Sequence, residues 1–479
     1  MVRNLFATLL EIFIVGFALF SPIIVTKSRD SFLSAASIKT TDVLLDAGTE
    51  WMVVLCLGMY FVTFLYFRSR TDSSLTQSRE SAMAAWHLIY VLFISAVLYA
   101  FYYKPSKLAL TFLACATFGQ GFGVLESGNR RADSRKCFEF SVVCLFVIFL
   151  SVAAFWGRYS ANLFSYWTYA RWTGPWNNPN VFGLLMGVGA TLAVGLGMGR
   201  TRGCRLRKGV ESRKLTVLEY LVKSFYFLAA LLMGHGLLHS YSRGAWLGTS
   251  CGMVYLVYQV SRRKSKAVVA KMEISVASSK DGRRAEEMSR CPFSSRSKHN
   301  GLLYLVILGS AALLMFWHFR YTNWHLAQRV LSPVNMADFS WRNRVAAWEG
   351  TLQISAEHPW LGAGWNEPES LYEHYYLPQK LTESAAIEMN DYLLLGATLG
   401  IPALFCFAMY LWLSLARKAE SRKQKVEIAN AGWLQTTSRA GAIVLLVGFW
   451  FDGGLFKLPT AATFWILLEL GNVRHELHE

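Results

Sequence analysis

Arginine, amide and aromatic side chains cluster at several places along this chain of 479 residues. The segment HSYSRGAWLG, at 239–248, places Arg243 in a turn between two apolar runs. The segment RWTGPWNNPNVFG carries Arg171, Trp176 and Asn180 just before another apolar run. A guanidinium can hold a phosphate through two parallel hydrogen bonds, and a helix N-terminus adds a positive dipole. Both segments therefore have the chemistry for a phosphate-bearing glycan, although Arg and Trp also serve as membrane-boundary anchors.

A third cluster, FSWRNRVAAWEGTLQISAEHPWLGAGW, occupies 339–365. Four apolar side chains recur in it at the spacing of one helical face: Trp341, Val345, Trp348 and Leu352. The pattern predicts an amphipathic helix that ends at His358–Pro359, with Arg342 and Arg344 near its start. Two interpretations stay open, because these Arg residues can lie among lipid headgroups or hold a pyrophosphate.

A fourth cluster supplies groups that can accept a proton. His374 lies within YEHYY, and Glu388, Asn390 and Asp391 follow at the mouth of an apolar run. A carboxylate or an imidazole can take the proton of a sugar hydroxyl during glycosyl transfer. Acidic residues on a wet loop are usually only solvated, but Asp391 stands where burial makes a charge expensive.

The composition decides which class of protein holds these clusters. Hydrophobic residues make up 53% of the chain and charged residues only 16%, below the usual share in soluble domains. The apolar residues come in blocks long enough to cross a bilayer as helices. We count twelve such blocks, at 6–26, 51–67, 83–103, 108–125, 138–157, 179–198, 217–239, 245–260, 302–319, 389–415, 440–456 and 458–473.

The predicted fold is therefore an all-α polytopic membrane protein with about twelve transmembrane helices. Spans one to eight occupy 1–260, a basic cytoplasmic linker 261–301, and the ninth span 302–319. A large, partly helical outer loop follows at 320–388, and 389–473 holds the last three spans.

The basic residues give the orientation. With the N-terminus inside and the spans alternating, the inner segments hold 33 of the 48 Lys and Arg residues. This asymmetry follows the positive-inside rule, so the net charge of +17 needs no nucleic-acid partner. Both termini are then cytoplasmic, and all four clusters lie on the outer side.

Several of these motifs, taken in order, resemble the O-antigen ligase and polymerase superfamily of bacterial envelopes. The matching pieces are SRGAWLG at 242–248, the pair Arg344 and Trp348, HPWLGAGW at 358–365, and NDYLLLGATLGIPALF at 390–405. A Trp-Asn-Asn-Pro-Asn loop at 176–180 lies upstream. The resemblance is strongest over 235–405.

The resemblance implies an inner-membrane enzyme with a large periplasmic loop between spans nine and ten. Such enzymes transfer a glycan from an undecaprenyl-pyrophosphate carrier to an acceptor, in lipopolysaccharide or related surface polysaccharide biosynthesis. Ligases use the lipid A core glycan, polymerases use another repeat unit, and neither needs a metal or nucleotide cofactor. Carried over by position, Arg243 and Arg344 would hold the donor pyrophosphate, with Arg342 and Arg171 as further candidates. Trp176, Asn180 and Asn390 would contact glycan.

One departure from the family pattern concerns the base. Many members carry a His just before the Asn that opens the tenth span, and here that position is Met389. Glu388, Asp391 or His374 would have to replace it. Functions of another class also stay open: a secondary transporter, or a membrane protein that binds the lipid-linked glycan without turning it over.

Overall fold

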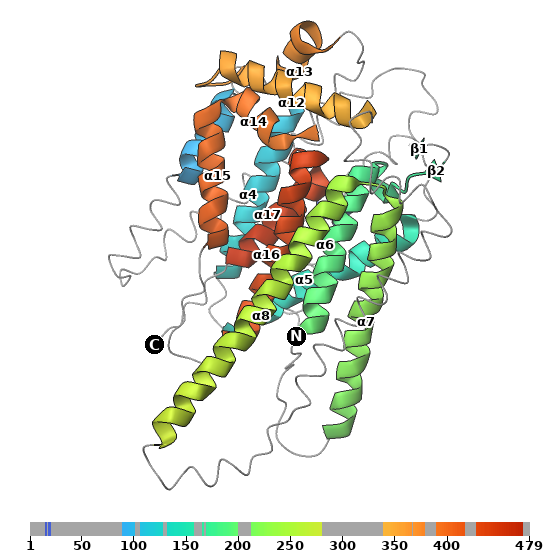
Figure 1. Cartoon of the computed structure of the whole chain (residues 1–479), viewed down its shortest axis with the longest axis vertical. Coiled ribbons are helices and arrows are strands. Elements are labelled where there is room, and N and C mark those ends of the chain that lie inside the picture. The colour runs from blue at the N-terminus through green and yellow to red at the C-terminus, as the bar shows by residue number, and fades with distance from the viewer. Residues whose placement is uncertain are drawn as a thin grey trace. The chain divides into compact units, whose positions relative to one another are not determined.

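A computed structural model gives the fold of the chain (Figure 1). The structure describes residues 15–16, 18–20, 89–100, 106–127, 132–157, 165–166, 169–199, 212–279, 339–365, 367–378, 389–416 and 428–472. Backbone contacts divide the chain into two units, one of residues 1–252 with 336–479 and one of residues 253–335. The packing and the site described below belong to the first unit.

The described elements are almost all helices. They are α4 (Lys107–Ser127), α5 (Ala132–Gly157), α6 (Pro179–Met198), α7 (Ser212–His239), α8 (Arg243–Ser279), α12 (Phe339–Glu357), α13 (Glu367–Leu371), α14 (Asp391–Leu399), α15 (Ile401–Ala416), α16 (Ile428–Phe451) and α17 (Leu458–Asn472). Short pieces accompany them: the 3₁₀ turn η1 (Gly174–Trp176), the π-helical turn η3 (Tyr372–Tyr376), and an antiparallel pair, β1 (Ser165–Tyr166) with β2 (Tyr169–Ala170). The predicted helical class is confirmed at this level.

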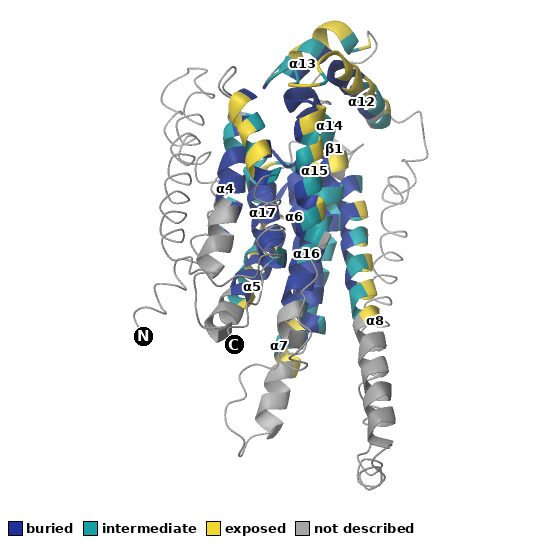
Figure 2. Ribbon diagram, turned by 90° about the vertical axis from the view of Figure 1, so that its left-hand side faces the viewer, coloured by how far each residue is buried: buried dark blue, intermediate teal, exposed yellow. Residues whose placement is uncertain are grey.

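The centre of the first unit is formed by α6, α16 and α17. Helix α6 packs against α7 and α16, while α17 packs against α4 and α16. Nearly every residue of α6 and α17 is buried, as the dark colour of these helices in Figure 2 shows. A helix that is apolar all round needs such surroundings, because it has no polar face to offer to water.

Four of the described helices are long and apolar enough to cross a membrane. They are Glu139–Trp156, Pro179–Met198, Tyr220–His239 and Trp433–Phe451. Large apolar side chains are exposed on the outward faces of α5 and α7, among them Phe155, Leu221 and Leu228. Exposed apolar faces on long helices indicate contact with lipid, so the chain is a helical membrane protein. The first, second and ninth predicted spans lie wholly or mostly outside the described residues.

The structure differs from the prediction in three segments. Helix α8 continues to Ser279, so the first part of the predicted linker is helical. The eleventh predicted span, 440–456, corresponds to α16, which begins at Ile428 and ends at Phe451. The tenth predicted span is divided at Gly400, where φ is 86°, into α14 and α15. Patterns of apolar residues do not mark such a break, because both halves are apolar.

A stripe of glycines lets α8 lie directly against α16. Gly244, Gly248 and Gly252 are four residues apart and therefore lie on one face of α8. A Cβ atom at Gly248 would lie only 2.4 Å from the carbonyl oxygen of Val444. Small residues at this spacing allow two helices to approach closely in a membrane. The glycines of the SRGAWLG motif thus hold the turn before α8 close to α16.

The close approach predicts that Gly248→Ala destabilises the protein. Forcing an extra methyl group into a packed contact costs about 1–3 kcal/mol, more than the gain in helix propensity. Gly234→Ala on α7 is the matched control, because no atom lies within 4 Å of the position of its Cβ. Thermal unfolding in detergent should show a lower midpoint for Gly248→Ala and an equal or higher one for Gly234→Ala. Equal midpoints for both variants would contradict the tight α8–α16 contact.

Candidate functional site

The turn between α7 and α8 is buried and held by hydrogen bonds. Tyr241 is buried and has the left-handed backbone conformation, with φ of 52°. The hydroxyl of Ser240 donates to the carbonyl of Leu237 and accepts from the backbone N–H of Ser242. The hydroxyl of Ser242 accepts from the backbone N–H of Ala245 and so caps the start of α8. Arg243, half-exposed, is the first residue of α8.

The carboxylate of Asp452 connects this turn to α12. Asp452 follows the end of α16 and is 1% exposed. Its Oδ2 accepts a hydrogen bond from the hydroxyl of Ser242, and its Oδ1 lies 3.1 Å from Nη2 of Arg344 in an ion pair. Gly244 is needed beside it, since a Cβ there would lie 2.4 Å from Oδ2. One carboxylate therefore joins the SRGAWLG motif to the Arg344 motif.

The loop that begins at Asp452 also holds α14. Asp391, the first residue of α14, is buried, and its Oδ2 accepts a hydrogen bond of 2.8 Å from the backbone N–H of Leu455. The side chain of Asn390 caps α14 by accepting from the N–H groups of Tyr392 and Leu393. These two polar residues therefore position the start of α14 against the loop that follows α16.

Helix α12 forms where the sequence predicts it, but it buries a different face. It ends at Glu357, directly before His358–Pro359. The buried residues are mostly small or polar: Asn343, Arg344, Ala347, Gly350, Thr351, Ile354 and Ser355. Leu352, on the predicted apolar face, is 55% exposed. Trp348 is half-buried against Trp450 and Phe451 of α16.

The two arginines of α12 point to different surroundings. Residues two apart on a helix lie on opposite sides, and Arg342 is exposed while Arg344 is 6% exposed. The Nε atom of Arg344 is buried and has no hydrogen-bond partner among the described residues, and the same is true of Nδ2 of Asn390. Unused buried donors are costly, so these two can still serve an acceptor-bearing ligand.

The HPWLGAGW segment is hydrogen-bonded to the break between α14 and α15. The N–H groups of Ala363 and Gly364 donate to the carbonyls of Ala397 and Thr398, at 2.8 and 3.0 Å. On the other side of the break, the N–H of Ile401 donates 2.8 Å to the carbonyl of Pro359. Helix ends leave such groups without partners inside the helix, and here an adjoining loop provides them. The loop after α12 and the broken helix are thus one unit.

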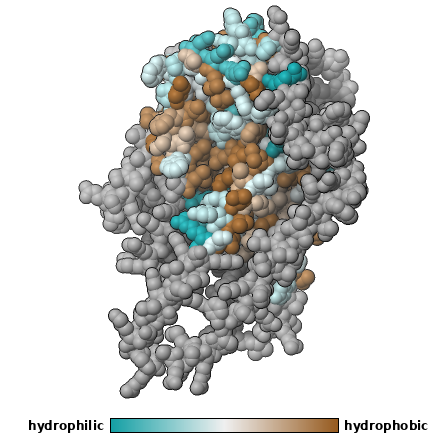
Figure 3. Space-filling view, in the orientation of Figure 1, coloured by the Kyte–Doolittle hydropathy of each residue, from teal (hydrophilic) through white to brown (hydrophobic). Residues whose placement is uncertain are grey.

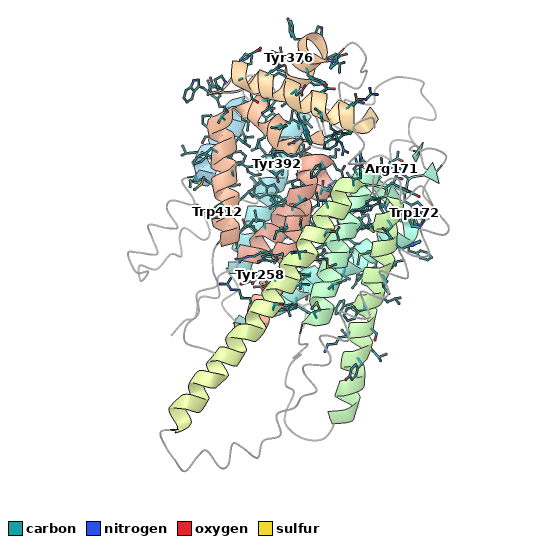
Figure 4. The ribbon with its side chains drawn as sticks, in the orientation of Figure 1. Arg171, Trp172, Tyr258, Tyr376, Tyr392 and Trp412 are labelled. Atoms are coloured by element: carbon teal, nitrogen blue, oxygen red, sulfur yellow. The ribbon has the colours of Figure 1, made fainter. Side chains whose placement is uncertain are left out.

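The predicted Arg171 cluster has a structural role in this arrangement (Figure 4). Nε of Arg171 donates 2.8 Å to the carbonyl of Ser240, and Nη2 donates 2.8 Å to Oδ1 of Asn180. The ring of Trp172 stacks on the ring of His239 with centroids 4.4 Å apart. The backbone N–H of Trp172 donates to the backbone carbonyl of His239. Arg171 therefore fixes the loop before α6 to the turn before α8.

The other residues predicted to contact glycan or to act as a base have separate surroundings. Trp176 is half-buried, and its Nε1 donates 2.6 Å to the carbonyl of Leu19. His374 is exposed on η3, with Nδ1 3.0 Å from the carbonyl of Ser370. Glu388 lies outside the described residues. Within the described ranges, no group of three His, Cys, Asp or Glu residues is placed to hold a metal ion.

Two tyrosines of η3 have shifted acid–base properties. Burial raises the pKa of Tyr372, and the nearby Glu349 carboxylate adds to the shift. A hydrogen bond to Glu357 raises the pKa of the Tyr376 hydroxyl. Both phenols are therefore neutral at physiological pH, so neither is a ready base.

Sequence reasoning missed the central residue of the site. Asp452 is followed by Gly453 and Gly454, which have φ of 65° and 148°. An Asp-Gly-Gly sequence is typical of an ordinary turn. The predicted eleventh span, 440–456, included Asp452 among its apolar residues. The signal that could have found it is the charge itself, since a carboxylate inside a predicted span is expensive and tends to be functional.

The geometry brings together segments that match a known family. A sequence model described as O-antigen ligase matches residues 228–408, which include the α7–α8 turn, α12 and α14. The match confirms the predicted resemblance, and the matched region is similar to the O-antigen ligase family. No curated protein matches the chain.

The buried ion pair predicts a large effect of removing one partner. Asp452→Asn should lower the free energy of unfolding by about 3–5 kcal/mol, because Arg344 is left as an uncompensated buried charge. The double variant with Arg344→Met should recover much of the loss. Glu373→Gln, at an exposed carboxylate, is the control. Thermal unfolding in detergent measures these three variants and the wild type, and a double variant no more stable than Asp452→Asn would contradict the pairing.

Proposed function

We propose that this protein is a membrane glycosyltransferase of the O-antigen ligase type. It transfers a glycan from an undecaprenyl-pyrophosphate carrier to an acceptor, the lipid A core glycan, on the periplasmic face of the inner membrane. The observation that carries the proposal is the contact of Asp452 with both Ser242 and Arg344. It brings two motifs of the family, far apart in sequence, to one place.

In this proposal Arg243 and Arg344 bind the donor pyrophosphate. Arg243 begins α8, so the helix N-terminus adds positive potential to its own charge. Arg344 uses Nη2 for Asp452 and has Nε left for a phosphate oxygen. Asp452 thereby acts as a positioning residue, because it orients the guanidinium and supplies the counter-charge that lets it stay buried.

The proposed reaction uses this arrangement. The acceptor hydroxyl oxygen attacks the anomeric carbon of the donor sugar, and the bond to the pyrophosphate oxygen breaks. Undecaprenyl pyrophosphate leaves with the bonding electrons, and the arginines stabilise its charge. Glu388, Asp391 or His374 takes the proton of the acceptor hydroxyl. Of these, Asp391 is joined to the Asp452 loop through Leu455. Direct displacement inverts the anomeric configuration.

Two alternatives use the same site differently. A polymerase would pass the glycan to a second carrier-linked repeat unit, and a non-catalytic protein would bind the lipid-linked glycan and release it unchanged. A secondary transporter would need neither a pyrophosphate site nor turnover. The acceptor consumed and the presence of a product separate these alternatives.

A turnover assay tests the proposal. Purified protein in liposomes receives undecaprenyl-pyrophosphate glycan with either core lipid or a second carrier-linked repeat. Arg243→Ala and Arg344→Ala should each lose roughly a hundredfold or more of the turnover, the usual effect of removing a donor to developing charge. Arg262→Ala is the matched control, because Arg262 is exposed on the same helix as Arg243.

The controls separate loss of function from loss of fold. Arg344→Lys keeps a cation beside Asp452 but removes the planar fork, so the protein should stay folded while turnover falls. Turnover by Arg344→Ala equal to that of Arg262→Ala would reject the pyrophosphate role. A product with retained anomeric configuration would reject direct displacement.

A further inference from the structure

Helix α15 has an exposed face made of apolar side chains. Ile401, Phe405 and Trp412 are 53%, 63% and 68% exposed, and their spacing places them on one face of the helix. Figure 4 labels Trp412 on this helix. The opposite face, with Phe407 and Tyr410, is buried. Water would favour polar side chains on the exposed face. An apolar exposed face on a helix of a membrane protein is instead the face that lipid covers.

At the N-terminal end of α15 this apolar face continues onto a different segment. Trp360 and Leu361, in the loop after α12, are 76% and 63% exposed. The N–H of Ile401 donates to the carbonyl of Pro359, and a Cβ at Gly400 would lie 2.4 Å from the carbonyl of Trp360. The loop is therefore fixed at the first residue of α15. Figure 3 shows hydrophobic residues gathered over the helices below α12.

The loop has the chemistry of a membrane interface. Its sequence from 358 to 363, HPWLGA, contains no Lys, Arg, Asp or Glu. Trp prefers the boundary between headgroups and acyl chains, where its ring is buried and its N–H stays hydrated. A Leu beside it extends into the acyl region. Continuity with the lipid-facing side of α15 therefore identifies the partner as the bilayer.

We propose that Trp360 and Leu361 form a lipid anchor, which inserts into the outer interface of the bilayer and holds the large loop against it. The anchor follows α12 directly, since the N–H of His358 still donates to the carbonyl of Ile354. Lipid contact at Trp360 therefore sets the depth of the helix that carries Arg344. The substrate of the proposed reaction is itself a lipid, so its headgroup would meet this helix at a fixed level.

Photocrosslinking in vesicles tests the anchor. The photoreactive residue p-benzoylphenylalanine replaces Trp360, Phe405 or Tyr375 in the full chain, reconstituted in phosphatidylethanolamine and phosphatidylglycerol. Tyr375 on η3 is the matched control, because it is also aromatic and 76% exposed but lies between His374 and Tyr376. Phe405 is the positive control for a lipid-facing position. Mass spectrometry of the irradiated protein counts phospholipid adducts.

The expected result is phospholipid adducts at position 360 in a yield near that at 405 and about tenfold above that at 375. A yield at 360 no higher than at 375 would overturn the proposal. So would crosslinks from 360 to a second protein chain in place of lipid. The assay contains no glycan donor, so it succeeds or fails independently of the proposed glycosyl transfer.

Discussion

Everything at the candidate site depends on the burial of one negative charge. A carboxylate removed from water must be compensated, and Asp452 finds its compensation in the Ser242 hydroxyl and the Arg344 guanidinium. Those partners come from the α7–α8 turn and from α12, which are about a hundred residues apart in the sequence. The electrostatic requirement of Asp452 thus fixes the positions of three elements at once. Gly244 belongs to the same arrangement, because any side chain there would take the space of the carboxylate.

A second constraint comes from the backbone. The tenth apolar run is broken at Gly400, and a break in a helix leaves carbonyl and N–H groups that cannot be left bare in a membrane. The loop after α12 bonds to both sides of the break, through Ala363 and Gly364 on one side and Pro359 on the other. Positive φ values at Gly362 and Gly400 allow these two segments of the chain to approach this closely. These glycines therefore allow the loop and the broken helix to form backbone hydrogen bonds with each other.

Periodicity and helix-breaking residues predicted much of the fold. The bounds of α6 and the end of α12 follow from local signals, a run of apolar residues in the first case and His358–Pro359 in the second. The buried face of α12 did not follow, because its core side carries small and polar residues that pack against α14, while Leu352 faces outward. The break at Gly400 and the role of Asp452 were also missed. Both depend on contacts between segments far apart in the chain, and no local pattern records which distant group satisfies a carbonyl or a charge. The hydrogen bonds of Arg171 to Ser240 and Asn180 likewise join segments that no local pattern pairs, and its contact with a phosphate stays a prediction.

The hydrogen-bonded junction between the loop and the broken helix has a consequence for modularity. Residues 358–365 and 390–401 share backbone partners, so neither segment has its conformation independently of the other. An exchange of the loop alone would therefore disturb both segments. A loop moved into another protein would lack the ends of α14 and α15, to which its backbone groups hydrogen-bond here. The broken helix of the recipient would in turn lose the loop groups that bond to its backbone. The unit that evolution or engineering can move as one piece is therefore the loop together with the helix it crosses.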